Sequence, residues 1–332
     1  MFQILFRLPE FLPIIGGAPI YGYGVMMVVG FFLSMELAKY LAKRSGLDAE
    51  VFANAALIGL VTGVLGARLS HVLENLSDYT RGDLSVGQNL WNAVNIRSGG
   101  LTYYGGFLLA FPALIAYGWY KRVPLRLGMD IIAPCLMVGL GLGRVGCYLN
   151  GCCYGAETNV AWGAQFPYRS DAYLEQVNHG EIVVPPELLN AAGVPRTIED
   201  IRRDRTMSEA QRGDLVKLAQ SQRALPVHPA ELYSTLTAML IAGFLLAYFT
   251  LPHAPGRVFA LMLMVEGVSR FLLETVRAEP AGTLFGHHIF GPLTFGEGLS
   301  VIIALMGVAL WFIFGSRQIW VERDGMGTVM VA

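Results

Sequence analysis

Charged residues are scarce in this sequence. Only 15% of the 332 residues are Asp, Glu, Lys or Arg, and 54% are hydrophobic, whereas an ordinary soluble domain carries about a quarter charged residues. A surplus of one sign of charge is also missing, because the formal net charge is −1, and this argues against nucleic acid as a partner. The first residues lack the basic, apolar and small-residue succession of a cleavable signal peptide, so we expect the first hydrophobic stretch to remain in the mature protein. The composition predicts an all-α integral membrane protein.

The sequence contains long apolar stretches, as the prediction of a membrane protein requires. A helix needs about 20 mostly apolar residues to cross a hydrocarbon core of ~30 Å. We expect about seven transmembrane helices in a single membrane domain formed by residues 1–332. Their approximate ranges are 20–41, 52–73, 101–120, 129–149, 229–251, 258–273 and 295–314. The sixth stretch is short and carries Glu266 and Arg270.

The basic residues of the short connecting segments all fall on one side of the predicted helices. They are Lys39, Lys43, Arg44, Lys121, Arg122, Arg126, Arg257, Arg317 and Arg323. Such residues mark the cytoplasmic side, so we expect the N-terminus outside and the C-terminus in the cytoplasm. The longer segments 76–100, 151–228 and 275–294 then lie outside. Residues 156–226 are expected to form an extracytoplasmic subdomain inserted between helices four and five, since long loops translocate regardless of charge.

Several charged residues fall inside the apolar stretches or close to their ends. They are Arg68, Arg144, Glu266, Arg270, Glu274 and Arg277. A charge at the centre of a membrane helix costs about 2.5–3.5 kcal/mol, so such residues normally face the inside of a bundle or a wet cavity. All lie towards the outer side, and they predict one outward-facing cavity that accepts anions.

Two arginine clusters carry this prediction. Gly143 and Gly146 flank Arg144 and permit close approach of a backbone or a lipid headgroup, and arginine binds phosphate in a bidentate manner. Arg270, Glu274 and Arg277 share one helix face, so Glu274 can orient both arginines towards a phosphate. The alternatives are structural: Arg144 extends to the membrane surface or pairs with a carboxylate, and the second cluster is an ion ladder at a helix end.

Two further clusters are weaker signals. Residues 98–106 place Tyr104 beside paired glycines at the outer interface, where tyrosines commonly serve only as anchors. His228 precedes Pro229 and Glu231 at the start of the fifth helix. His228 is a candidate proton acceptor near neutral pH, and the alternative is an ordinary interface residue.

Three of the four cysteines, Cys147, Cys152 and Cys153, fall within seven residues. On an oxidising outer side, a disulfide from Cys147 to Cys152 or Cys153 is one interpretation, and free buried thiols are the other. We expect no metal site, because no suitable fourth ligand is nearby in the sequence, and no cofactor.

Taken in order along the chain, these clusters resemble the prolipoprotein diacylglyceryl transferase family. The family's glycine-arginine run matches Gly143 to Gly146 and continues to Asn150 and Gly155. Its HP-x-x-LY element matches 228–233, its arginine-phenylalanine, glutamate and arginine element matches 270–277, and its tyrosine-glycine pair matches Tyr23 and Gly24.

The resemblance implies a seven-helix enzyme of the bacterial cytoplasmic (inner) membrane. Such an enzyme moves a diacylglyceryl group from phosphatidylglycerol to the lipobox cysteine thiol in the signal peptide of a preprolipoprotein, and glycerol 1-phosphate leaves. The expected partners are therefore phosphatidylglycerol, these signal peptides and membrane lipids. The implied catalytic residues are Arg144, Arg270, Tyr104 and His228; the implied substrate-binding residues are Arg144, Arg270, Glu274, Arg277, Tyr23, Asn150 and Gly155.

The chain departs from the family pattern at five positions, which indicates a divergent subfamily. Tyr104 stands in place of a histidine, Cys147 of an asparagine, Cys152 of a glutamate, Glu231 of a glutamine and Glu266 of a tyrosine. The base that accepts the thiol proton is therefore open between His228, Glu231 and the Tyr104 hydroxyl. An unperturbed tyrosine is a poor base at neutral pH, so hydrogen bonding to the headgroup suits Tyr104 better.

Two rival functions remain open on sequence alone. One is a related transferase with another lipid donor or thiol acceptor, and the other is a membrane transporter or non-catalytic scaffold. Transporters commonly contain inverted repeats with broken helices, and the sequence shows no internal repeat.

Overall fold

A computed structural model describes most of the chain. The residues that it describes are 4–7, 19–80, 85–95, 100, 102–277, 288–290, 293–315, 322–323 and 328–329. The chain forms two compact units, the first comprising Met1–Leu33, Leu136–Ala247 and Ala260–Phe312, and the second comprising Ser34–Cys135, Tyr248–Phe259 and Ile313–Ala332. Residues 98, 99 and 101 of the glycine and tyrosine cluster and Arg317 lie outside the described residues.

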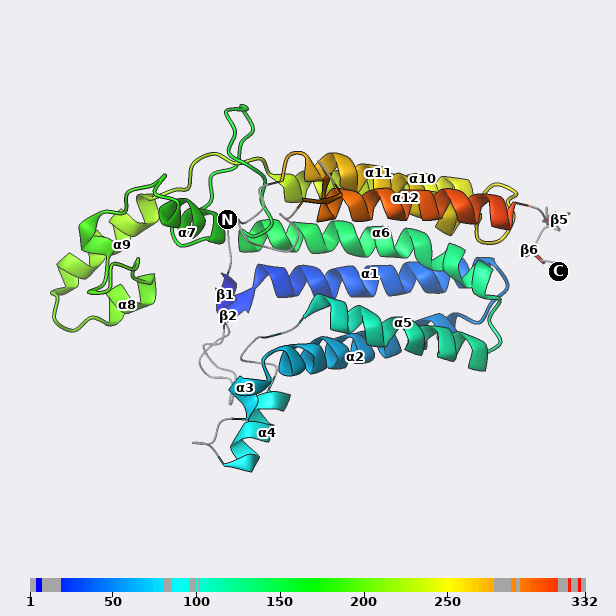
Figure 1. The fold of residues 1–332 in the computed structure, drawn as a ribbon, viewed down its shortest axis with the longest axis horizontal. Helices are drawn as coiled ribbons and strands as arrows, with labels where there is room; N and C mark the ends of the chain where they lie inside the picture. Colours follow the sequence, from blue (N-terminus) through cyan, green and yellow to red (C-terminus); the bar gives the residue numbers. More distant parts are fainter. Residues whose placement is uncertain are drawn as a thin grey trace. The chain divides into compact units, whose positions relative to one another are not determined.

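Each of the seven predicted apolar stretches contains a helix (Figure 1). These helices are α1 (Gly22–Arg44), α2 (Ala49–Glu74), α5 (Tyr103–Tyr120), α6 (Leu125–Asn150), α10 (Ala230–Phe249), α11 (Arg257–Glu274) and α12 (Phe295–Phe314). Five of them, α1, α2, α6, α10 and α12, are long and apolar enough to cross a membrane by length and composition. The helix α11 carries four charged residues in 18, and a total of seven spans stays a prediction.

The remaining elements are short. The short helices are α3 (Leu76–Tyr79), α4 (Val86–Val94), α7 (Asp171–Asn178), η2 (Pro186–Leu188), α8 (Ile198–Arg203) and α9 (Glu209–Ser221). The strands form three antiparallel pairs: β1 (Ile4–Arg7) with β2 (Pro19–Tyr21), β3 (His288–Phe290) with β4 (Leu293–Thr294), and β5 (Glu322–Arg323) with β6 (Thr328–Val329).

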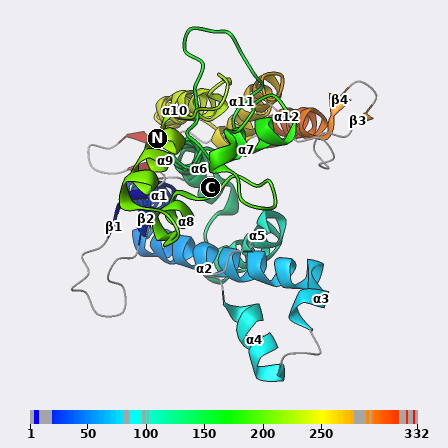
Figure 2. The same cartoon turned by 90° about the vertical axis from the view of Figure 1, so that its left-hand side faces the viewer.

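Glycines bring the helices of the first unit into close contact. A Cβ on Gly267 of α11 would lie 2.8 Å from the Ala304 nitrogen of α12, and one on Gly307 of α12 would lie 2.7 Å from the Met264 nitrogen of α11. Small residues let membrane helices approach this closely because lipid supplies no hydrophobic force between them. The two helices lie side by side, with α10 next to them (Figure 2). The unit is therefore held by backbone proximity as much as by side-chain packing.

The segment between α6 and α10 has a hydrophobic core of its own. Phe166, Tyr173, Leu188 and Ile201 have 0% exposure and belong to one cluster that extends from Tyr154 to Val227. The Tyr154 hydroxyl donates a hydrogen bond to the Glu175 carboxylate. Burial, and then this hydrogen bond, raise the pKa of Tyr154 above its ordinary value, so the phenol stays neutral and keeps its donor. The segment is a folded body, whereas its outer location stays a prediction.

Two helices of the second unit, α2 and α5, also meet through glycine. A Cβ on Gly66 would lie 2.4 Å from the Gly105 carbonyl oxygen, and one on Gly106 would lie 2.9 Å from the Gly63 oxygen. The Thr102 nitrogen donates to the Ala67 oxygen at 3.0 Å. The paired glycines 105 and 106 therefore have a packing reason to be there.

Arg68 is an anchor for backbone in the second unit. Its Nε donates to the Ala93 oxygen at 2.9 Å, its Nη1 to the Gly100 oxygen at 2.9 Å and its Nη2 to the Asn92 oxygen at 2.6 Å. These bonds give Arg68 a structural role that the sequence did not predict, since the sequence grouped Arg68 with the arginines of a common cavity.

Asp130 of α6 fixes the start of α11. Its side chain has 0% exposure and accepts hydrogen bonds from the Gly256 nitrogen at 2.6 Å and the Phe259 nitrogen at 2.9 Å. The His253 Nε2 lies 3.7 Å from its Oδ2. A carboxylate at a helix N-terminus satisfies otherwise unpaired N–H groups and interacts favourably with the helix dipole.

We predict that Asp130→Ala lowers the free energy of unfolding by about 3 kcal/mol, because two buried N–H groups lose a charged acceptor. Thermal unfolding of the purified protein in detergent measures this change. The matched control is Asp214→Ala on α9, whose side chain is 81% exposed in a loose pair with Lys217 and contributes close to nothing. Equal stability of the two variants would contradict the assigned role of Asp130.

Candidate functional site

A cavity in the first unit is lined by five charged residues of α6, α11 and the segment just beyond α11. It has about 420 Å³ of empty space, part of which is open to solvent. Its lining comes from α6, the loop after α6, α10, α11 and the residues just beyond α11. The lining residues are Leu140, Arg144, Cys153, Ala230, Ser234, Glu266, Arg270, Leu273, Glu274 and Arg277. The structure thus places residues of both arginine clusters in the lining of one cavity.

Two carboxylates balance the arginines of this cavity in different ways. Arg277 Nη1 lies 3.6 Å from Glu274 Oε2, and the Glu274 side chain is only 5% exposed. Gly296 at the start of α12 leaves room for that carboxylate, because a Cβ there would lie 2.5 Å from Glu274 Oε1. Glu266 interacts electrostatically with Arg270 and Arg144. Glu274 is therefore placed to orient Arg277, and Glu266 is a second carboxylate within electrostatic reach of Arg270.

Gly155 connects the three chain segments around the cavity. Its nitrogen donates to the His228 oxygen at 2.8 Å, the Ala156 nitrogen donates to the Val276 oxygen at 3.0 Å, and the His228 nitrogen donates to the Ala156 oxygen at 2.9 Å. A Cβ on Gly155 would lie 2.4 Å from the Val276 oxygen and 2.6 Å from the His228 Cβ. Only glycine fits where these three segments meet, so Gly155 affects the site through its backbone and not through a side chain.

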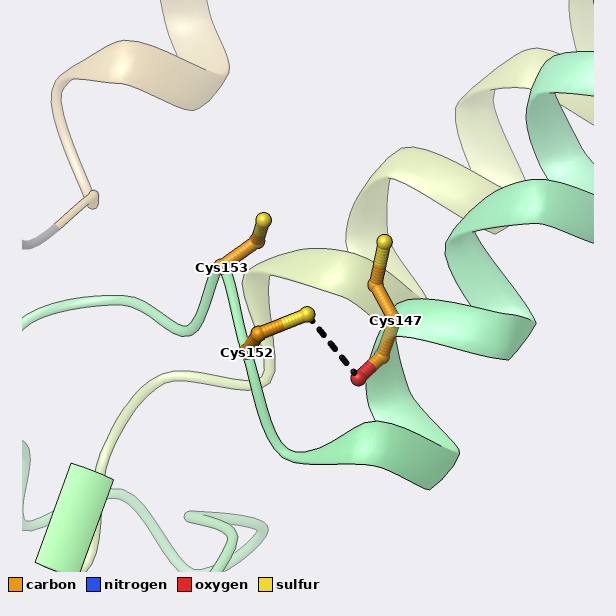
Figure 3. A group of neighbouring side chains, drawn as sticks. All are labelled: Cys147, Cys152 and Cys153. Atoms are coloured by element: carbon orange, nitrogen blue, oxygen red, sulfur yellow. Dashed lines mark hydrogen bonds between the residues drawn. The ribbon is translucent and has the colours of Figure 1, made fainter. Parts of the chain in front are cut away.

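The cysteines gather where α6 ends. Gly151 ends the helix with φ 81°, a conformation that favours glycine, and the chain turns back over the last turn of α6. Figure 3 shows the sulfur atoms of Cys147, Cys152 and Cys153 facing the space between that turn and the following loop, and all three lie within 4.8 Å of one another. Cys153 has φ 66°, a strained conformation for a residue with a side chain, and such strain gathers at functional sites.

Glu231 is buried beside the cavity without a hydrogen-bond partner. Its exposure is 0%, and neither of its carboxylate oxygens has a partner among the residues that the structure describes. It interacts electrostatically with Cys153, Arg144 and Arg277. A buried polar group without a partner is costly, so this carboxylate calls for a ligand or a chemical role.

The other residues expected at the site are placed as follows. His228 is not among the lining residues, and its Nδ1 lies 3.2 Å from the Tyr233 hydroxyl. Tyr23 of α1 packs on Gly146, whose Cβ would lie 3.1 Å from the tyrosine ring. Asn150 ends α6 and its side chain forms a hydrogen bond with Cys152. Tyr104 begins α5 in the second unit, with 46% exposure.

The sequence named Glu231 only as an alternative base, and it placed Glu266 among the residues of the cavity without a specific role. Both stand where the chain departs from the family pattern, and burial of the first became visible only in three dimensions. The signal available in the sequence was a carboxylate within or at the edge of an apolar helix.

These features define a class: a multi-pass membrane protein with an arginine-lined cavity suited to an anionic headgroup. A family model described as prolipoprotein diacylglyceryl transferase matches residues 9–313. The chain belongs to this family, which confirms the resemblance found in the sequence.

Individual relatives give the same picture. A phosphatidylglycerol–prolipoprotein diacylglyceryl transferase of Chromobacterium violaceum is 29% identical over 93% of this chain and 98% of its own length. One from Clostridium tetani is 24% identical over 91% of this chain and 96% of its own length. One from Rhodopirellula baltica is 33% identical over 61% of this chain, and the match spans 43% of that protein.

We predict that Gly155→Ala reduces the activity of the protein at least tenfold, because a methyl group there must displace the backbone that carries His228 and Val276. The activity is measured as lipid transfer in isolated membranes. Gly213→Ala on α9 is the matched control, since a Cβ there meets nothing within 4 Å and alanine favours a helix. Wild-type activity in the Gly155 variant would show that the crossing tolerates a side chain.

Proposed function

We propose that this protein transfers a diacylglyceryl group from phosphatidylglycerol to the lipobox cysteine of preprolipoproteins, and that the cavity of the first unit holds the phosphate. The observation that carries the proposal is the convergence of Arg144, Arg270 and Arg277 on one cavity. Membership of the family supports the reaction. The relatives' printed names supply the lipid donor and the protein acceptor.

The charges of the cavity suit a phosphodiester. Three arginines and two glutamates line it, and 3 − 2 leaves one positive charge among these side chains. A phosphodiester carries one negative charge, which matches the excess among the lining side chains. Glu231, buried beside the lining and within electrostatic reach of Arg144 and Arg277, is outside that sum. Guanidinium forks bind phosphate oxygens in pairs, and their attraction is stronger in an apolar surrounding than in water.

The reaction then follows from where charge develops. The acceptor thiolate attacks the glyceryl carbon next to the phosphate, a carbon–sulfur bond forms, and the carbon–oxygen bond to the phosphate breaks. The electron pair leaves on the phosphate oxygen, and glycerol 1-phosphate departs. Arg144 and Arg270 stabilise that growing negative charge because they are fixed before the reaction begins. Glu274 and Arg277 hold the geometry of the site.

The membrane topology expected from the sequence is part of the proposal. Seven spans place the N-terminus outside and the C-terminus in the cytoplasm of a bacterial inner membrane, with basic loops inside. The subdomain of residues 156–226 stands on the outer side, where signal peptides of exported lipoproteins arrive. Tyr23 and Asn150 flank the cysteine loop as substrate-binding candidates. Tyr104 stays a catalytic candidate implied by the resemblance, and hydrogen bonding to the headgroup suits a tyrosine better than accepting a proton does.

The two-arginine proposal predicts that Arg144→Ala and Arg270→Ala each lower diacylglyceryl transfer by about 100-fold or more, as loss of a donor to a developing oxyanion does. The assay uses phosphatidylglycerol and a lipobox peptide in membranes. Arg203→Ala, at a side chain that is 81% exposed on α8, is the control and retains full activity. Equal levels of inserted protein must be shown for all variants. Retained transfer by either cavity variant would refute the proposal.

A milder effect is predicted for His228→Gln. The Nδ1 of His228 lies within hydrogen-bond distance of the Tyr233 hydroxyl, and its backbone holds Gly155 and Ala156, a role that any side chain preserves. Transfer is therefore expected to fall by no more than about tenfold, because a positioned general base contributes 10²–10⁴-fold and His228 is not in the described lining of the cavity. A loss of 100-fold or more would identify His228 as the base.

A further inference from the structure

The thiols of Cys147, Cys152 and Cys153 have the geometry of a metal site. Their sulfur atoms lie within 4.8 Å of one another. A tetrahedral zinc ion with sulfur ligands at about 2.3 Å places those sulfurs about 3.8 Å apart. One ligand comes from the rigid last turns of α6 and two from the loop that Gly151 turns back (Figure 3). Small side-chain rotations close the difference.

Two further features lie at or near this sulfur cluster. Cys153 is held at a φ of 66°, and this strained backbone keeps its thiol with the other two. Glu231 is completely buried with both oxygens unpartnered among the described residues, and Cys153 is one of its electrostatic neighbours. Arg144 and Arg277 are also within electrostatic reach of Glu231, and a divalent cation among the thiolates would add positive charge on the Cys153 side of this carboxylate.

We propose that Cys147, Cys152 and Cys153 bind one zinc ion, with a fourth position that is open to the cavity and takes the thiol of the acceptor peptide. This replaces the expectation of no metal, which rested on the lack of a fourth ligand in sequence. The substrate is that ligand. The open position is expected to face the cavity because Cys153, one of the three ligands, lines the same cavity as Arg144 and Arg270. The inference rests on the proposed function.

The chemistry that a three-thiolate zinc site supplies is activation of a thiol. Catalytic zinc sites have three protein ligands and an open position, and a thiol that coordinates zinc is deprotonated. The thiol proton passes to water in the open cavity. The thiolate then forms the carbon–sulfur bond while the carbon–oxygen bond to phosphate breaks, and the leaving phosphate keeps the electron pair. No separate protein base is needed, which suits a cavity whose described lining includes no histidine.

Metal content tests the site without reference to activity. The full-length protein is purified in detergent without chelator, and zinc is counted by mass spectrometry per mole of chain. About one zinc ion is expected in the wild type, and at most a tenth of that in Cys147→Ser, Cys152→Ser and Cys153→Ser. Cys135→Ser is the matched control: this buried cysteine of α6 donates to the Ile131 oxygen at 3.2 Å, a bond that serine can keep. A melting temperature for each variant separates metal loss from misfolding.

The redox state of the three thiols is a second test, and it can contradict the proposal. Alkylation with and without reductant, followed by peptide mass mapping, is expected to find all three thiols reduced and protected by the metal. A wild-type protein that holds no zinc even after zinc is added, or that contains a disulfide from Cys147 to Cys152 or Cys153, overturns the proposal.

The open position has its own test. Cobalt replaces zinc, and the sulfur-to-metal charge-transfer band is recorded before and after a lipobox peptide is added. The band is expected to grow with the cysteine peptide and not with the same peptide carrying serine. An unchanged band would mean that a protein group already fills the fourth position.

The two proposals fail in different ways. If the transfer function is wrong, the wild type shows no diacylglyceryl transfer, while zinc is still counted. If the zinc site is wrong, transfer proceeds at full rate in a protein that holds no zinc, and a chelator does not slow it.

Discussion

Positive charge enclosed in an apolar bundle is the constraint on which the rest of this structure depends. Arg144, Arg270 and Arg277 sit on or beside helices whose other residues are mostly apolar, and each charge costs several kcal/mol unless it is compensated. Glu274 compensates Arg277 directly and Glu266 acts on Arg270 and Arg144. The side chains that line the cavity carry three positive and two negative charges, and in the proposed function an anionic headgroup matches the excess.

Glycine makes this arrangement possible. Close contacts at Gly267 and Gly307 join α11 to α12, and Gly296 lets the Glu274 carboxylate lie against the first turn of α12. Gly155 crosses between His228 and Val276, so the loop that carries the cysteines is fixed to the start of α10 and the end of α11. The geometry of the arginines therefore depends on residues that have no side chain of their own. These contacts explain why the scattered glycines of the apolar stretches matter beyond simple packing.

Much of this could be predicted from the sequence. The apolar stretches predicted the long helices, since length and hydropathy follow from the bilayer. The prediction that Arg270, Glu274 and Arg277 share one helix face was wrong for Arg277, because α11 ends at Glu274 and Arg277 pairs with Gly155 in a β-bridge beyond the helix. The family and its transferase activity were identified from ordered motifs and are confirmed by the family match. Contacts distant in sequence could not be predicted: Arg68 binds the carbonyls of residues 92, 93 and 100, and the carboxylate of Glu231 is buried with no hydrogen-bond partner in the part of the chain that the structure describes. Neither fact follows from local pattern, because both depend on how separate segments pack.

The central claim is that Arg144 and Arg270 hold the same phosphate. A crystal structure of the protein grown in a lipid phase that contains phosphatidylglycerol tests this claim most directly. The account predicts headgroup phosphate oxygens within hydrogen-bond distance of both guanidinium groups, inside the cavity of the first unit. A headgroup bound at a different place, with these two arginines contacting only protein, would contradict it.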